Sequence, residues 1–218
     1  MSIAVLNQVL KFPDPRHANA KGLVAVGGDL SVERLLAAYR AGVFPWTVSP
    51  ISWWSPDPRA ILELDQLHIG ESLKKILRKE IFQVTVDTAF SEVIQNCAMR
   101  APGRADTWIT EEFIAAYTRL HERGHAHSLE CWQDGKLAGG IYGVAIGGLF
   151  AGESMFHRAS NASKVALCHL VERLRERGFQ LFDIQMLTPV TKQMGGVTIP
   201  REEYLRRLEK ALRVPCEF

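Results

Sequence analysis

The chain has 218 residues, of which 47% are hydrophobic and 23% charged, and its formal net charge is +2. These values are ordinary for a globular protein, and a net charge this small means that a nucleic-acid partner would have to meet a local patch. The uncharged stretch of residues 137–152 is too short and too rich in glycine to span a bilayer. The four cysteines lie far apart and no basic-then-apolar leader opens the sequence, so we expect a cytoplasmic protein with free thiols.

Residues 1–61 are dense in proline, glycine and tryptophan, and we expect them to form a small N-terminal domain. A serine cap and a glycine stop predict a helix over residues 32–41. Trp46, Trp53 and Trp54 fall within nine residues, on a backbone that nearby prolines keep extended. They form either a compact aromatic core or a surface on which other rings stack.

A regular alternation of apolar and polar residues begins at Leu62, and we expect residues 62–218 to form a larger domain. Periodicity and caps predict helices over residues 71–79, 87–99, 110–123, 164–177 and 200–212. Strands are predicted over residues 82–86, 127–132 and 179–185.

An apolar hairpin lies in the middle of this domain, with predicted strands over residues 137–146 and 149–156. The glycine pair between them supplies the positive φ angles that a tight turn needs. Glu153 is the one charged residue of the hairpin. It either points to solvent or meets a partner or ligand, because burial of a bare carboxylate is costly.

The strand after the long helix carries Leu181, Asp183 and Gln185 on one face, by the two-residue period. An acid and an amide on an inner strand are unusual, and they form either a polar pair that holds a loop or part of a site. Strand, hairpin, long helix and strand follow one another as in an N-acetyltransferase-like domain. The sequence therefore predicts an α/β (α+β) fold, with a small N-terminal domain packed on that domain.

No cofactor or metal is expected. The link between hairpin and helix, residues 157–162, has no glycine to expose backbone N–H groups to a phosphate, and no P-loop occurs elsewhere. His121, His125 and His127 suggest a metal site as an alternative. Gly124 interrupts their helix, however, and no H-E-x-x-H pattern surrounds them.

Several blocks, spread over nearly the whole chain, resemble the leucyl/phenylalanyl-tRNA–protein transferase family. They are Gly27-Gly28-Asp29-Leu30, Phe44-Pro45-Trp46, Trp53-Trp54-Ser55-Pro56-Asp57-Pro58-Arg59, Thr107-Trp108-Ile109-Thr110, Gly124-His125-Ala126-His127-Ser128, Gly152-Glu153-Ser154-Met155-Phe156 and Asn161-Ala162-Ser163-Lys164. The resemblance implies a cytoplasmic enzyme that moves Leu, Phe or Met from aminoacyl-tRNA onto proteins that begin with Arg or Lys, marking them for degradation. It also implies that no metal or coenzyme is needed.

Glu153, Asp183 and Gln185 are the candidate catalytic residues. An amide cannot hold a proton at neutral pH, so we expect Gln185 to position the amine and the reacting carbonyl. Asp183 is expected to fix Gln185 or to collect the proton late, and Glu153 to attract the cationic acceptor.

The resemblance also implies the residues that bind the donor. Trp46 and Trp108 would hold the terminal adenosine, and Tyr117 is a further candidate substrate-binding residue. The pocket for the donor side chain would be lined by Ile141, Phe150, Leu167, Leu170 and Phe182.

Four cations on one predicted helix, Lys74, Lys75, Arg78 and Lys79, either form a solvated face or contact the tRNA backbone. Two other functions stay open on the residues alone. They are a coenzyme A-dependent N-acetyltransferase, which the missing glycine turn disfavours, and a non-catalytic RNA-binding module, which would not need the polar set around Glu153.

Overall fold

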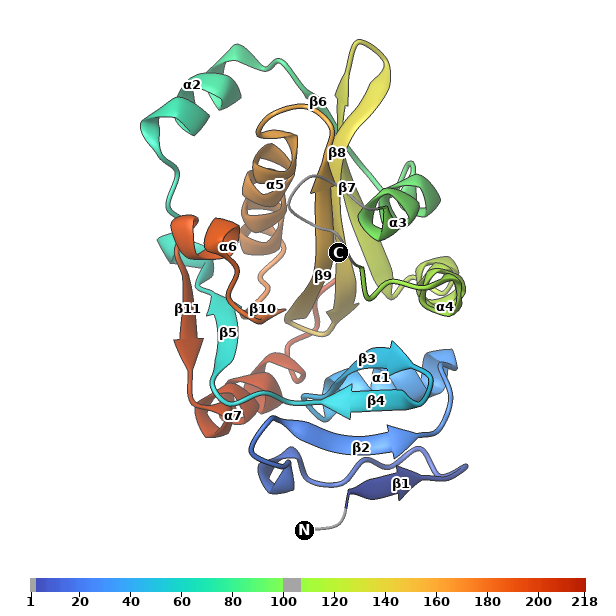
Figure 1. Ribbon diagram of the computed structural model, residues 1–218. Coiled ribbons are helices and arrows are strands. Elements are labelled where there is room, and N and C mark those ends of the chain that lie inside the picture. The colour runs from blue at the N-terminus through green and yellow to red at the C-terminus, as the bar shows by residue number, and fades with distance from the viewer. Residues whose placement is uncertain (1–2, 100–106) are drawn as a thin grey trace.

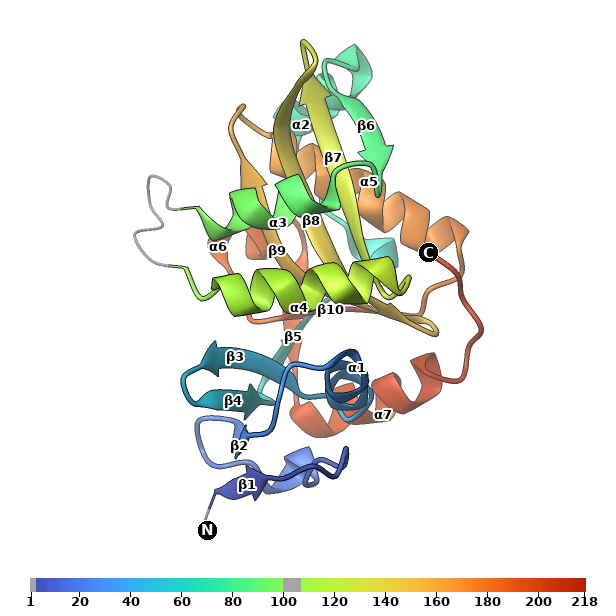
Figure 2. The same ribbon diagram turned by 90° about the vertical axis from the view of Figure 1, so that its right-hand side faces the viewer.

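A computed structural model of the chain describes residues 3–99 and 107–218, and in these ranges it contains two β-sheets. The small sheet comes from the N-terminal segment, and helices pack on both faces of the large one (Figures 1 and 2). Within the same ranges no helix is long and apolar enough to cross a bilayer.

The small sheet has the strand order β1-β2-β4-β3, and helix α1 (Val32–Arg40) packs against β3. Ser31 starts this helix, and its hydroxyl accepts a hydrogen bond from a backbone N–H of the first turn. The fully buried Trp53 lies at the centre, edge-on to Phe12 with ring centroids 4.9 Å apart. The strands are β1 (Ala4–Leu6), β2 (Leu23–Gly27), β3 (Phe44–Val48) and β4 (Ile51–Trp54), and a short 3-10 helix, η1 (Pro15–His17), follows β1.

The large sheet has the order β11-β5-β10-β9-β8-β7-β6 in the described residues, and β9 and β10 are its parallel neighbours. Its strands are β5 (Arg59–Leu62), β6 (Gln83–Val86), β7 (Ala126–Gln133), β8 (Lys136–Ile146), β9 (Leu149–His157), β10 (Leu181–Gln185) and β11 (Gly196–Ile199). After β4 the chain leaves the small sheet, and the next strand, β5, lies between β10 and β11 in the large sheet. The domain boundary expected between residues 61 and 62 falls inside this strand.

Helix α5 (Ala162–Glu176) covers one face of the large sheet, and α3 (Phe90–Ala98) and α4 (Glu111–Glu122) cover the other (Figures 1 and 2). Helix α7 (Arg201–Ala211) lies beside the small sheet, whereas α2 (Glu71–Lys79) lies at the opposite end of the molecule (Figure 1). The remaining short helices are η2 (Leu64–Gln66) and α6 (Pro189–Gln193).

Successive side chains of β8 point to opposite faces of the large sheet, as in any β-strand. Ile141 belongs to the core under α5, and Tyr142 belongs to the core that α3, α4 and the small sheet share. Gly143 is needed for room, because a Cβ there would lie 2.3 Å from the carbonyl oxygen of Ala151. The hairpin turns at Gly147, whose φ is +53°.

The predicted fold class is confirmed. Strand, hairpin, long helix and strand appear as β7, β8–β9, α5 and β10, and the small N-terminal sheet packs on this acetyltransferase-like arrangement. The last predicted helix corresponds to α7, one residue shorter at each end.

Candidate active site

Strands β9 and β10 part at the centre of the large sheet. Their pairing ends at Ala151 and Asp183, and Glu153 and Gln185 each lie two residues beyond this last pair. The Gln185 amide nitrogen donates a hydrogen bond to Oε1 of Glu153 over 2.7 Å. Both residues are largely buried, with 9% of Glu153 and 8% of Gln185 exposed. The side chains of two of the three candidate catalytic residues are thus in direct contact, and the third, Asp183, accepts from the backbone N–H of Gln185.

Two buried tyrosines complete the surroundings of Glu153. Tyr117 of α4 donates its hydroxyl to Oε2 of Glu153 over 3.0 Å, and the hydroxyl of Tyr39 from α1 lies 2.5 Å from that of Tyr117. Burial raises the pKa of both tyrosines well above 10, so both hydroxyls keep their protons. Tyr117, a candidate from the sequence, is therefore a neighbour of the carboxylate.

Burial also raises the pKa of Glu153 from 4.5 to about 7. The hydroxyls of Tyr39 and Tyr117 oppose this shift, the negative charge of Asp183 adds to it, and the Gln185 amide opposes it. A carboxyl with a pKa near 7 changes its charge within the physiological range, which is a property typical of functional sites.

Asp183 lies beside this pair, fully buried, and the described part of the chain directs four donors at its carboxylate. Arg59 donates from Nε to Oδ1 over 2.9 Å and from Nη2 to Oδ2 over 2.6 Å. The Tyr204 hydroxyl donates to Oδ2 over 2.8 Å, and the Gln185 backbone N–H donates to Oδ1 over 2.9 Å. Burial alone would lower the pKa of Arg59, but the charges of Asp183, Tyr204 and Glu153 and the hydrogen bonds to Asp183 together outweigh burial and raise it, so Arg59 stays charged.

Trp46 and Trp108, expected to hold an adenosine, are half-buried at the edge of the core that the small sheet shares with α4. Trp46 lies edge-on to Trp54, with ring centroids 5.3 Å apart. Trp108 lies edge-on to Phe113, with centroids 5.1 Å apart. Each indole keeps part of its surface open to solvent.

The five residues expected to line the donor pocket also come together, in the core between α5 and the large sheet. Each is at most 5% exposed. They lie on the opposite face of the sheet from Tyr117, since Tyr117 belongs to the other core. Phe182 packs tightly on Gly152, the neighbour of Glu153: a Cβ on Gly152 would lie 2.9 Å from its ring.

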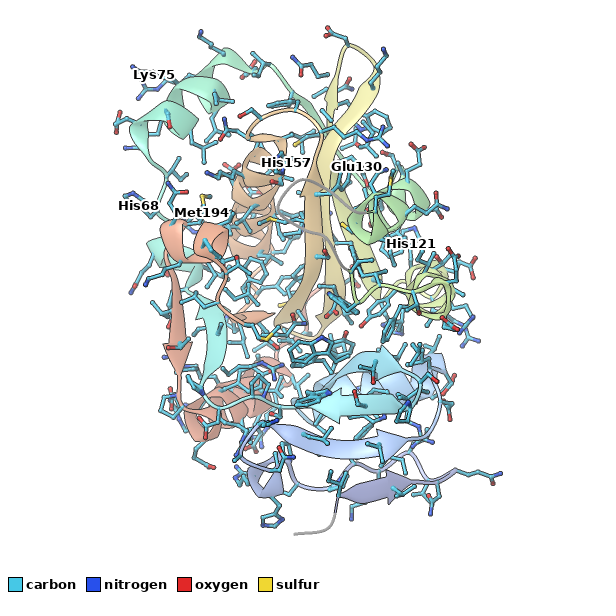
Figure 3. The ribbon with its side chains drawn as sticks, in the orientation of Figure 1. His68, Lys75, His121, Glu130, His157 and Met194 are labelled. Carbon is cyan, nitrogen blue, oxygen red and sulfur yellow. The ribbon has the colours of Figure 1, made fainter. Side chains whose placement is uncertain are left out.

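The four cations expected to contact tRNA are exposed on α2, at the end of the molecule far from the small sheet (Figure 1). Lys75 points outward from this helix (Figure 3). Lys74 forms an ion pair with Glu71 over 2.7 Å, at a position where both side chains are largely open to water. The structure therefore separates these cations from the Glu153 cluster.

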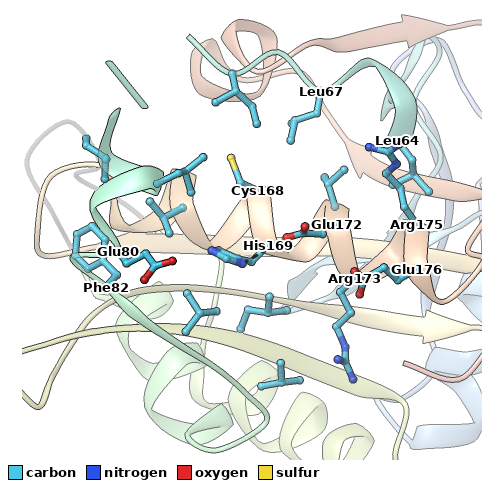
Figure 4. A pocket seen from close by; sticks show the side chains of 18 of the residues that line it. Leu64, Leu67, Glu80, Phe82, Cys168, His169, Glu172, Arg173, Arg175 and Glu176 are labelled. Carbon is cyan, nitrogen blue, oxygen red and sulfur yellow. Dashed lines mark ion pairs between the residues drawn. The ribbon is translucent and has the colours of Figure 1, made fainter. Parts of the chain in front are cut away.

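A groove of about 1010 Å³ runs between α2, β6 and α5 (Figure 4). Its walls combine apolar residues, such as Leu67 and Phe82, with charged residues, such as Glu172 and Arg173. None of the described residues that surround Glu153 contributes to its walls. The groove is thus separate from the candidate site.

Among the described residues, no group of three or more histidine, cysteine, aspartate or glutamate side chains is placed to hold a metal ion. His121 stacks on the ring of Phe90 with centroids 4.2 Å apart (Figure 3). The Nδ1 atom of His127 lies 2.7 Å from Oδ2 of Asp87. Both rings therefore serve contacts within the fold.

Sequence analysis missed three residues of the cluster. Arg59 ends the block of residues 53–59 that carries the resemblance, so a signal was present there. Tyr39 and Tyr204 lie on the buried sides of α1 and α7, and in the sequence they cannot be distinguished from ordinary core residues. Only the structure brings them to the carboxylates.

Comparison with known proteins identifies the family of the chain. A family model described as leucyl/phenylalanyl-tRNA protein transferase matches residues 61–209, and the N-terminal domain model of the same family matches residues 28–57. The leucyl/phenylalanyl-tRNA–protein transferase of Oleidesulfovibrio alaskensis is 49% identical over 99% of this chain and 90% of its own length. That of Pseudoalteromonas atlantica is 49% identical over 97% of this chain and 92% of its own.

Solved structures are more distant. The structure of L-PGS from Bacillus licheniformis is 14% identical, with a TM-score of 0.43, and covers 72% of this chain and 51% of that one. A GCN5-related N-acetyltransferase from Kribbella flavida is 10% identical, with a TM-score of 0.40, over 75% of this chain and 59% of that one.

The family models and the sequence relatives define the class of protein as an aminoacyltransferase. Family models cover both the small and the large sheet, and the relatives align over nearly the full chain. The chain belongs to the leucyl/phenylalanyl-tRNA–protein transferase family.

Proposed function

We propose that the chain moves Leu, Phe or Met from aminoacyl-tRNA onto the N-terminal α-amine of proteins that begin with Arg or Lys. The reaction takes place in the cytoplasm and marks these proteins for degradation. Family membership supports the transfer from aminoacyl-tRNA to protein. The observation that carries the proposal is the buried contact between Glu153 and Gln185 at the point where β9 and β10 part.

The ester of aminoacyl-tRNA is already activated. The amine nitrogen bonds to the ester carbonyl carbon, the bond from that carbon to the ribose oxygen breaks, and the amine proton passes to that oxygen through the neighbouring ribose hydroxyl. An N-terminal α-amine has a pKa of about 7.7–8.0, so a useful fraction of it is already neutral. The enzyme must mainly orient the reactants and stabilise charge.

Gln185 is suited to orient the amine. Its amide nitrogen is directed at Glu153, so its side-chain oxygen faces away, and within the described residues that oxygen has no hydrogen-bond partner. An amide oxygen held in this way accepts a hydrogen bond from the incoming amine. Ionised Glu153, next to it, attracts the amine while that amine is still an ammonium ion.

For Asp183, the four donors support one of its two expected roles. Both carboxylate oxygens are engaged, and the partner Arg59 carries a fixed positive charge. With both oxygens occupied by these donors, the carboxylate holds the backbone N–H of Gln185 and has no oxygen left free for the reacting amine. Asp183 therefore fixes Gln185, and the proton leaves by the ribose hydroxyl.

Donor recognition follows from apolar and aromatic surfaces. Half-buried Trp46 and Trp108 offer faces on which the terminal adenine stacks. The core residues near Phe182 receive the donor side chain where β9 and β10 part. An apolar pocket separates Leu, Phe and Met poorly, since one methylene is worth only about 1–3 kcal/mol. The exposed cations of α2 hold the tRNA backbone farther away.

The test is a transfer assay with leucyl-tRNA and a peptide that begins with Arg. Leucine is expected on the free α-amine of this peptide, whereas the same peptide with an acetylated N-terminus accepts none. A peptide that begins with Glu is the specificity control. Equal transfer to that peptide contradicts the acceptor preference, and absence of transfer to the Arg peptide contradicts the proposed function.

A further inference from the structure

Arg59 is the buried cation nearest to the candidate site, and no step of the proposed reaction uses it. We infer that Arg59 is a positioning residue: it holds Asp183, which in turn holds Gln185 in the backbone conformation that directs its amide at Glu153 and the acceptor. The inference rests on the proposed function, since it takes Gln185 as the residue that meets the amine.

The first step is the fork between Arg59 and Asp183. Each side chain is 1% exposed, and the two N–H···O contacts measure 2.9 Å and 2.6 Å. A guanidinium presents its donors in a fixed plane that matches a carboxylate, so the fork sets the orientation of Asp183 as well as its charge. Lysine offers the charge without the fork.

The second step is the backbone at Gln185. Its N–H donates to the same Oδ1 of Asp183 that accepts from Arg59. Gln185 has a φ of +54°, a left-handed conformation that a residue with a Cβ disfavours, and the pairing of β10 with β5 shifts register between Asp183 and Gln185. Such a conformation persists only where the surroundings fix it.

The third step is what the conformation achieves. In a regular strand Asp183 and Gln185 would point the same way. The bulge and the positive φ turn the Gln185 side chain so that it reaches Glu153 on β9 while its backbone stays on Asp183. If Arg59 no longer fixes Asp183, the backbone of Gln185 relaxes toward the extended conformation and its side chain moves away from Glu153.

Arg59 is itself held from two sides. Its Nη1 donates to the Gly42 carbonyl over 3.2 Å, and its guanidinium lies over the rings of Phe44 and Tyr204 at 4.8 Å and 4.4 Å. The small sheet and α7 thus fix the arginine, and the arginine transmits their position to the strand that carries Gln185.

The experiment is a double-mutant cycle with Arg59→Lys, Gln185→Ala and the combined variant, assayed with leucyl-tRNA and the Arg peptide. Arg59→Lys is expected to lower kcat about tenfold or more while the KM for leucyl-tRNA stays within twofold. Because Arg59 acts through Gln185, the same substitution in the Gln185→Ala background changes kcat less than twofold.

The matched control is Arg34→Lys. Arg34 is also fully buried, and it donates to the carbonyls of Val9 and Asn7 over 2.7 Å each, within the small N-terminal domain. It is expected to lower the melting temperature and to leave kcat unchanged at a temperature where the protein is folded. Equal losses of kcat for Arg59→Lys with and without Gln185 would overturn the inference, as would wild-type kcat for Arg59→Lys.

A second measurement decides the matter if Gln185→Ala is too slow to assay. Amide hydrogen exchange at Gln185 reports its bond to Asp183 without any reaction. Arg59→Lys is expected to speed this exchange at least tenfold, and Arg34→Lys to leave it unchanged. Unchanged exchange in Arg59→Lys overturns the inference even if the proposed transfer is confirmed. Failure of the wild-type transfer assay alone counts against the proposed function and leaves the exchange result intact.

Discussion

Burial raises the pKa of Glu153 from 4.5 to about 7, so between these pH values the folded protein holds a proton that the unfolded chain has released. Stability from this group is therefore fully present below pH 4.5 and is lost as pH rises through 7. The loss amounts to about 3 kcal/mol by the usual conversion of a pKa shift.

Glu153→Gln cannot titrate and escapes this loss. Its free energy of unfolding, relative to the wild type, is expected to rise by up to about 3 kcal/mol between pH 4.5 and pH 8.5. Chemical denaturation at the two pH values measures it. The same variant should transfer leucine far more slowly, because it no longer attracts the ammonium group. A stability difference that is the same at both pH values would contradict the buried titration of Glu153.

Asp183→Asn removes the charge that pairs with buried Arg59. Breaking a buried ion pair from one side typically costs about 3–5 kcal/mol, and transfer to the Arg peptide should also fall severely at a temperature where the variant is folded. Thermal melts and kcat are the two measurements. Asp29→Asn is the control: Asp29 also pairs with a buried arginine, but its own side chain is 53% exposed, so its loss costs much less. Near-normal turnover of Asp183→Asn contradicts its role in the site.

Helix α2 carries the exposed cations for which we propose contact with the tRNA backbone. Replacement of all four cations by alanine should weaken tRNA binding. It should also reduce the slope of the logarithm of the binding constant against the logarithm of the salt concentration by up to about 3, since each phosphate contact contributes about 0.7–0.9. Binding is measured over a salt series. The control removes Arg206, Lys210 and Arg213 from the α7 region, at the opposite end of the molecule. A slope that changes equally in both variants contradicts a specific contact at α2.

Substitution of Trp46 and of Trp108 tests whether these half-buried indoles bind the substrate or only pack in the core. Trp46→Ala and Trp108→Ala should each raise the KM for aminoacyl-tRNA about 5- to 150-fold, which is what about 1–3 kcal/mol of stacking corresponds to. The melting temperature should stay nearly intact, because both indoles are only half-buried. Trp53→Ala is the control, since fully buried Trp53 serves the core and its loss should lower the melting temperature strongly. A collapse in stability for Trp46→Ala without a selective KM effect assigns Trp46 to the core instead.

The sequence predicted elements that local patterns define. The hairpin β8–β9 has its glycine turn, α5 has its apolar period and α7 its start after a proline, so each was found within a few residues. Strands β5 and β11 were not predicted, since each has four residues and pairs only with strands distant in the chain.

The same limit applies to the site. Glu153 and Gln185 stood out because a polar residue on an apolar strand is locally unusual. The partner of Asp183, by contrast, lies 124 residues away in the sequence, and no spacing within one element indicates it.

At the scale of the whole molecule, residues 1–61 contribute side chains to the candidate active site. Residues 62–218 alone would lack Tyr39, Arg59 and most of β5, which leaves Asp183 buried without its cation. This fragment is expected to show no cooperative melting transition, because an unpaired buried charge and a missing inner strand destabilise the large sheet. Circular dichroism during heating measures this, with the full chain as control. A fragment that melts cooperatively and transfers leucine contradicts the dependence on the small domain.

The donors around Asp183 also determine at which point of its own synthesis the enzyme can become active. Arg59 is made early and Asp183 late, and Tyr204, which donates to the same carboxylate, comes another 21 residues on. A nascent chain that has emerged as far as Gln185 thus carries the reacting groups without the element that closes their support. We expect it to be nearly inert, so that translation releases an active transferase only after α7 has been made and folded.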